Sequence, residues 1–156
     1  MTCKDRLEAY LRDNRVAFHL QHHPLAYTAQ EVAASEHIPG KFLAKVVMVV
    51  ADGKSALLAL PATHRIDLDE ARHVLGTQSV RLADENELAK AMPDCDVGAI
   101  PPFGNLYGLS VYVDKSLAED KTIIFQAGTH TDTISVKYAD FERLVRPTIA
   151  RFARHS

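Results

Sequence analysis

The sequence predicts an α+β fold: one domain over residues 1–156, with helices packed outside a curled, barrel-like mixed sheet of about six or seven strands. Helix-start signals alternate with short strand patterns along the chain. The segment VVMVV is apolar throughout, which is typical of a central strand covered on both faces. With 156 residues, of which 47% are hydrophobic, the chain is long enough to bury one core.

Helices are predicted first from their starts. Four positions show the spacing of a capping box, in which two side chains three residues apart satisfy backbone amides at the helix start. These pairs are Thr2 with Asp5, Thr28 with Glu31, Asp67 with Glu70, and Asp84 with Glu87. The third helix is expected to end at Gly76 and the fourth at Pro93. Residues 139–156 are expected to form a last helix, kinked at Pro147.

Strand patterns lie between and after these helices. The stretch from residue 43 to 61 is predicted to be a hairpin that turns at Asp52-Gly53, because this dipeptide favours the tight turn between antiparallel strands. Alternating or β-branched patterns predict further strands at residues 16–20, 78–83, 109–114, 122–128 and 131–137.

Composition excludes several classes of protein. The net charge of −2 argues against a general polyanion binder. Cys3 and Cys95 are far apart and match no disulfide framework, so reduced thiols in a cytoplasmic protein are expected. The charged start has no apolar signal core, and the longest apolar run is too short to cross a membrane.

Two residues stand out as candidates for chemistry. Lys45 shares a strand face with Leu43, Val47 and Val49, and a lysine there must reach water, a cleft or an anionic partner. It is either a functional cation or a strand residue whose ammonium extends to solvent. His130 lies in a turn between two strand patterns, where functional residues are common; the alternative is an ordinary solvated turn residue.

No metal or cofactor is expected, because the sequence lacks HExxH, a Cys/His cluster, a phosphate-binding loop and the GxGxxG fingerprint. The GxSxG elbow of a serine nucleophile is also absent. Cys95 stands three residues before Gly98 and could be a nucleophile, but a packed, small apolar residue is the favoured interpretation.

Arginines gather near the end of the chain. On a continuous helix they would share one broad arc: Arg143, Arg146, Arg151 and Arg154. From residue 137 onward five basic residues oppose two acidic ones, which predicts either a surface for a polyanion or an ordinary solvated helix face.

The segment DVGAIPPFG, residues 96–104, is a stiff loop without an obvious catalytic side chain. It resembles the Gly-x-x-x-Pro-x-Gly loop of the YbaK-like aminoacyl-tRNA deacylases, with Gly98, Pro102 and Gly104 at the matching positions. This superfamily includes the editing insertion domain of bacterial prolyl-tRNA synthetase and its free-standing relatives. The segments HHPLAYTAQEVA, FLAKVVMVVADG and AGTHTDTISV match further motifs in the same order.

The resemblance implies that the protein hydrolyses the ester of a mischarged tRNA in trans, without a covalent nucleophile. Backbone amides of the loop would stabilise the developing oxyanion, and the 2′-hydroxyl of the substrate is thought to assist in relatives. The implied catalytic residues are Lys45, Gly98 and His130. The implied substrate-binding residues are Ala99, Ile100, Pro102, Gly104, Tyr27 and Thr28. The charge cluster near the end of the chain adds Arg143, Arg146, Arg151 and Arg154 as candidate tRNA-binding residues.

The expected partner is a mischarged aminoacyl-tRNA, with a synthetase in a transient complex, and neither DNA nor a membrane. The amino acid removed stays open among alanine, cysteine, serine and threonine. A non-catalytic module that binds the tRNA acceptor end or a protein is the alternative, and retention of Lys45 favours the enzyme.

Overall fold

A computed structural model describes residues 1–155. These residues form a mixed sheet of eight strands and a small sheet of two strands. Seven strands of the larger sheet follow the order β1-β8-β7-β2-β3-β6-β9, and β5 pairs with β2 beside this path. The α+β class and the mixed sheet are therefore confirmed. Strands outnumber the prediction because three-residue strands, too short to show a sequence pattern, pair at the edges as β4, β9 and β10.

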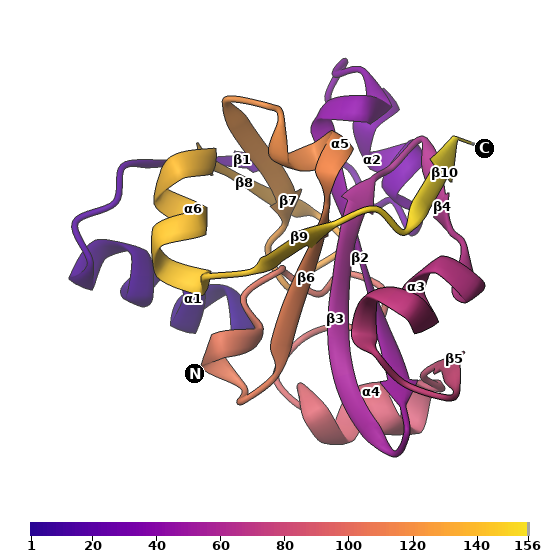
Figure 1. Ribbon diagram of the computed structural model, residues 1–156. Coiled ribbons are helices and arrows are strands. Elements are labelled where there is room, and N and C mark those ends of the chain that lie inside the picture. The colour runs from indigo at the N-terminus through magenta and orange to yellow at the C-terminus, as the bar shows by residue number, and fades with distance from the viewer. Residues whose placement is uncertain (156) are drawn as a thin grey trace.

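The strands are β1 Phe18–His22, β2 Leu43–Ala51, β3 Lys54–Pro61, β4 His64–Ile66, β5 Val80–Leu82, β6 Ser110–Asp114, β7 Thr122–Gln126, β8 Asp132–Lys137, β9 Thr148–Ala150 and β10 Ala153–His155. The helices are α1 Cys3–Asp13, α2 Ala29–Ser35, α3 Leu68–Leu75, α4 Glu85–Ala91, α5 Lys115–Ala118 and α6 Tyr138–Val145, with 3-10 turns η1 Gly40–Phe42 and η2 Gly104–Leu106. Figure 1 shows α1 and α6 on one side of the molecule and α3 and α4 on the other.

The predicted helix starts are confirmed. Thr2, Thr28, Asp67 and Asp84 each cap a helix by accepting a backbone amide of its first turn. At Thr2 and Asp84 the reciprocal bond of the capping box is also present. These starts were predictable because a cap depends on residues only three positions apart.

The predicted hairpin is also confirmed. β2 and β3 pair antiparallel from Ala44 opposite Pro61 to Ala51 opposite Lys54. At the turn, Asp52 and Gly53 both have positive φ, of 48° and 83°, as a tight two-residue turn requires. β2 also pairs with β7 and β5, so it is central, as its apolar sequence predicts.

The prediction of a kinked helix over residues 139–156 is wrong. α6 ends at Val145, and the chain continues as β9 beside β6 and β10 beside β4. Pro147 disfavours the helical conformation of the residue before it, and Arg146 takes a positive φ of 53°. Phe152, 1% exposed, then holds the segment in the core. Arg151 and Arg154 therefore lie outside the helix that carries Arg143.

The expectation of two separate thiols is wrong as well. Cys3 and Cys95 form a disulfide, with Cα atoms 4.9 Å apart across a sequence separation of 92 residues. The start of α1 lies against the segment after α4, where the Cys3 amide donates to the carbonyl of Asp94 over 3.0 Å. The distance between the two cysteines in the sequence does not predict this contact. The contact depends on how α1 packs against the folded sheet.

Candidate active site

The loop of residues 96–104 is fastened to the turn between β7 and β8. The Gly128 amide donates to the carbonyl of Ala99, and the Asp96 amide donates to the carbonyl of Gly128, both over 2.9 Å. The side-chain Nε2 of Gln126 donates to the carbonyl of Gly98 over 3.4 Å. Two segments that the sequence singled out separately are therefore one structural unit.

The second half of the loop is its anchor. Phe103 is fully buried, with its ring centroid 5.2 Å from that of Phe125 and 5.5 Å from that of Phe141. A Cβ at Gly104 would lie 2.6 Å from the carbonyl oxygen of Leu109, so only glycine fits. The following expected substrate contacts are all buried in this anchor: Ala99, Ile100, Pro102 and Gly104. These residues support the loop from within the core.

Gly98 is the exposed part of the loop. Its φ of +86° belongs to the left-handed region, which residues with a Cβ rarely adopt. A Cβ there would come within 3.5 Å of Cε1 of His130. Within residues 1–155, the amides of Val97, Gly98 and Ile100 donate to no acceptor. The loop thus presents unpaired N–H groups beside an imidazole.

His130 is held at the rim of this loop. Its Nε2 lies 3.0 Å from the carbonyl oxygen of Val97, and since a carbonyl only accepts, Nε2 carries the proton. Its Nδ1 is buried and has no partner within the described residues. The ring of Tyr27 packs against the imidazole, with centroids 5.0 Å apart. Thr28, next in sequence, is occupied in capping α2, where its hydroxyl contacts the amide and carboxylate of Glu31.

A buried polar cluster behind the loop was missed by the sequence analysis. The hydroxyl of Thr133 donates to the Glu36 carboxylate, with oxygen distances of 2.7 and 2.9 Å. Nε2 of His23 lies 3.7 Å from the same carboxylate, and the two side chains are 1% and 2% exposed. Thr133 is paired with Gln126 in the sheet. No local pattern marks this cluster, because its members come from three elements that meet only in the folded protein.

Lys45 lies on the outer face of β2, half-buried, and Nζ donates to the carbonyl of His64 over 2.5 Å. Burial lowers the pKa of this ammonium from its ordinary value. Lys45 lines a groove of about 260 Å³ whose other walls include Val47 and Ile66. Among residues 1–155 no direct contact joins it to Gly98 or His130.

Lys45 shares a face of the sheet with Gln126, which contacts the loop. β2 and β7 run parallel, with Leu43 opposite Ile124 and Ala44 opposite Phe125. Lys45 and Gln126 are the next residues of these two strands, so they share one face. Gln126 in turn holds the carbonyl of Gly98. The buried part of the loop packs on the opposite face, where Phe103 contacts Phe125.

The four arginines are not carried by one helix. Arg143 pairs with Asp140 on α6, over 3.3 Å, and Arg154 pairs with Asp67. Arg146 is the residue at the left-handed end of α6. Arg151 lines a cavity with Lys115.

One cluster of the described residues has the spacing of a metal site: ligand atoms of Cys3, Asp94 and Cys95 lie within 4.8 Å of one another. The two sulfur atoms are bonded to each other, so neither is a thiolate. The Asp94 carboxylate accepts the hydroxyl of Tyr107 over 2.8 Å and pairs with Arg6 over 3.1 Å. Burial and this carboxylate raise the pKa of Tyr107. The cluster is therefore a structural contact between α1 and the loop.

Comparison with known proteins points to one family. Residues 23–144 match the family described as "Aminoacyl-tRNA editing domain". The chain is 26% identical over 125 residues to the proline–tRNA ligase of Geobacter sulfurreducens, covering 80% of the chain and 21% of the ligase. It is 31% identical over 99 residues to the multifunctional Ser/Thr-tRNA deacylase ProXp-y of Escherichia coli (strain K12), covering 63% of the chain and 59% of that protein. The chain thus spans only part of these relatives.

Solved structures share the fold. A candidate trans-editing enzyme for prolyl tRNA synthetase superimposes with a TM-score of 0.85 at 19% identity, over 99% of this chain and 98% of that one. The crystal structure of a hypothetical protein gives a TM-score of 0.86 at 19% identity, over 95% of this chain and 99% of that one. Among residues 1–155, no helix has the length and apolar character to cross a membrane.

Proposed function

Since the chain belongs to the aminoacyl-tRNA editing domain family, we propose that it is a trans-editing deacylase, which hydrolyses the ester between a wrong amino acid and its tRNA. The observation that carries this proposal is the loop at Gly98. Its unpaired amides lie beside a histidine whose Nε2 is fixed by the Val97 carbonyl.

The chemistry proposed for this site is positioning and electrostatic stabilisation. An aminoacyl ester is already activated, so a covalent nucleophile is not needed. Attack on the carbonyl carbon by water, or assistance from the 2′-hydroxyl, places negative charge on the carbonyl oxygen. Rigid backbone N–H groups are suited to stabilise that charge. The buried prolines and Phe103 support this role, because they hold the exposed amides in place.

Lys45 and His130 take separate roles in this proposal. Lys45 supplies a partly desolvated cation for a phosphate or for developing charge near the ester. His130 positions the exposed end of the loop through the bond from Nε2 to the Val97 carbonyl. Tyr27 supports the imidazole by ring packing. The substrate would be tRNA charged by a synthetase in the cytoplasm. The protein would form at most a transient complex with that synthetase.

The test is a panel of alanyl-, cysteinyl-, seryl- and threonyl-tRNAs incubated with the purified protein, with and without EDTA. ProXp-y is a Ser/Thr-tRNA deacylase by name, so the seryl and threonyl substrates are the first to measure. We expect release of at least one amino acid, unaffected by EDTA. No release from any substrate would favour the non-catalytic binding module, and loss in EDTA restored by zinc would favour a metal hydrolase.

A further inference from the structure

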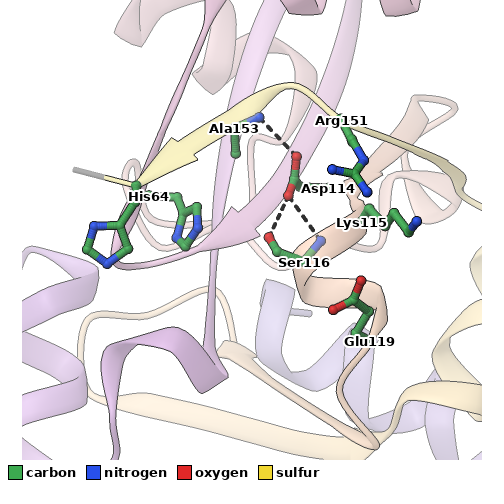
Figure 2. Close-up of a pocket in the computed structure, with 8 residues that line it drawn as sticks. His64, Asp114, Lys115, Ser116, Glu119, Arg151 and Ala153 are labelled. Carbon is green, nitrogen blue, oxygen red and sulfur yellow. Dashed lines mark hydrogen bonds between the residues drawn. The ribbon is translucent and has the colours of Figure 1, made fainter.

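A second cavity lies beside the candidate active site, between α5 and the C-terminal segment. Its volume is about 320 Å³, and Figure 2 shows the residues that line it. They are His64, Asp114, Lys115, Ser116, Glu119, Arg151, Ala153 and His155. The cavity adjoins Lys45, because the carbonyl that accepts its Nζ belongs to His64.

Asp114 builds the wall of this cavity. One carboxylate oxygen accepts the amides of Phe152 and Ala153, both over 2.9 Å, and the other accepts the amide of Ser116 over 3.1 Å and its hydroxyl. The residue is only 4% exposed. Its oxygens are therefore occupied by donors that fix the C-terminal segment against α5, and they are not free to bind a cation.

Two cationic side chains of the lining reach into the cavity. Lys115 and Arg151 reach the cavity from α5 and from the C-terminal segment (Figure 2), and both are exposed. Neither forms an ion pair with another residue of the described chain, whereas Arg143 and Arg154 each do. The imidazoles of His64 and His155 meet at the other wall, with centroids 5.2 Å apart. Glu119 is the one exposed carboxylate of the lining.

The geometry points to a phosphate site centred on Arg151 and Lys115. A guanidinium binds phosphate oxygens through two parallel N–H donors, and an ammonium adds a point charge. The phosphate would belong to the backbone of the tRNA acceptor end. This part of the inference rests on the proposed function. An ester placed near Lys45 would bring a preceding phosphate of the same strand toward His64 and the cavity.

The experiment measures binding separately from hydrolysis. Uncharged tRNA is titrated into the wild type and into Arg151→Gln and Lys115→Gln. Arg81→Gln is the matched control, since Arg81 is exposed on β5 and is already paired with Glu87. We expect each cavity variant to bind about threefold to tenfold more weakly. The slope of log Kd against log salt should become shallower by about 0.7–0.9 per lost contact. The control should bind as the wild type does.

A parallel titration with inorganic phosphate shows whether the site takes tRNA phosphate or free phosphate. Binding is monitored by the NMR shifts of the Lys115 and Arg151 amides. Phosphate binding that Arg151→Gln abolishes supports the site even if no tRNA is bound, which separates this inference from the deacylase proposal. Loss of phosphate binding with unchanged tRNA binding would assign the site to a free phosphate compound. Cavity variants that match the control for both ligands would overturn the site.

Discussion

The imidazole of His130 donates its Nε2 proton to the backbone carbonyl of Val97, directly beside Gly98. This bond joins the β7–β8 turn to the exposed end of the loop and fixes which ring nitrogen remains an acceptor. One contact between residues 33 positions apart thus sets both the position of the His130 ring and its tautomer.

The His130→Ala variant should lose the hydrogen bond that holds the exposed end of the loop. A hydrogen bond of this kind contributes about 0.5–1.5 kcal/mol, so kcat/KM should fall about threefold to tenfold. Steady-state deacylation measures the loss, and His19→Ala, at an exposed position of β1, is the control. Equal rates for the two variants would remove His130 from the site.

Replacing Gly98 should be severe. A left-handed φ costs a residue with a Cβ about 1–2 kcal/mol, and Gly98→Val adds a branched side chain next to His130. Gly108→Ala is the control, because Gly108 also has a positive φ, of 71°, but has no atom within 4 Å of its added Cβ. Single-turnover deacylation measures the loss of activity, and a thermal melt measures the loss of stability. A folded Gly98→Val protein with wild-type turnover would place the chemistry elsewhere.

Lys45→Ala should lose about tenfold to several-hundredfold in the rate of deacylation, the range for one charge-assisted contact in a partly desolvated site. Lys45→Arg should rescue it poorly, since the planar guanidinium does not replace a compact ammonium. Thermal stability should change little or rise, because the variant removes a cation that burial disfavours. A rate within about twofold of the wild type would exclude a catalytic role.

The pH dependence of Lys45 has a definite sign. Burial lowers its pKa below the ordinary 10.5, so the folded protein releases this proton before the unfolded chain does. The rate advantage of wild type over Lys45→Ala should be full below the lowered pKa and should vanish as the pH rises through it. The stability penalty from the buried ammonium should fade over the same alkaline range. The rates of the wild type and Lys45→Ala are compared after subtraction of spontaneous ester hydrolysis. If the ratio of the two rates stays constant up to pH 10.5, Lys45 does not have this role.

The disulfide should matter for stability more than for chemistry. It closes a separation of 92 residues, so its reduction should lower the free energy of unfolding by about 2–4 kcal/mol. Cys3→Ala and Cys95→Ala should each cause a similar loss but keep most activity, because no covalent step is assigned to Cys95. Denaturant unfolding with and without dithiothreitol tests this. A large fall in kcat for Cys95→Ala alone, with its fold intact, would revive the nucleophile.

The local elements of this fold were determined by the sequence itself. Capping side chains act on amides three residues away, and Asp52-Gly53 sets its turn within two residues. The stiffness of residues 96–104 was equally visible, because prolines restrict the backbone wherever they stand. Such signals do not depend on what packs against the segment.

Tertiary structure alone decided the rest. The C-terminal strands form because Phe152 is buried and Asp114 accepts two amides of that segment, which outweighs the helical pattern of its residues. The contact of Cys3 with Cys95, the cluster around Glu36 and the cavity at Arg151 each join elements distant in sequence. Their geometry follows from how the whole sheet packs, and no short stretch of sequence contains that information.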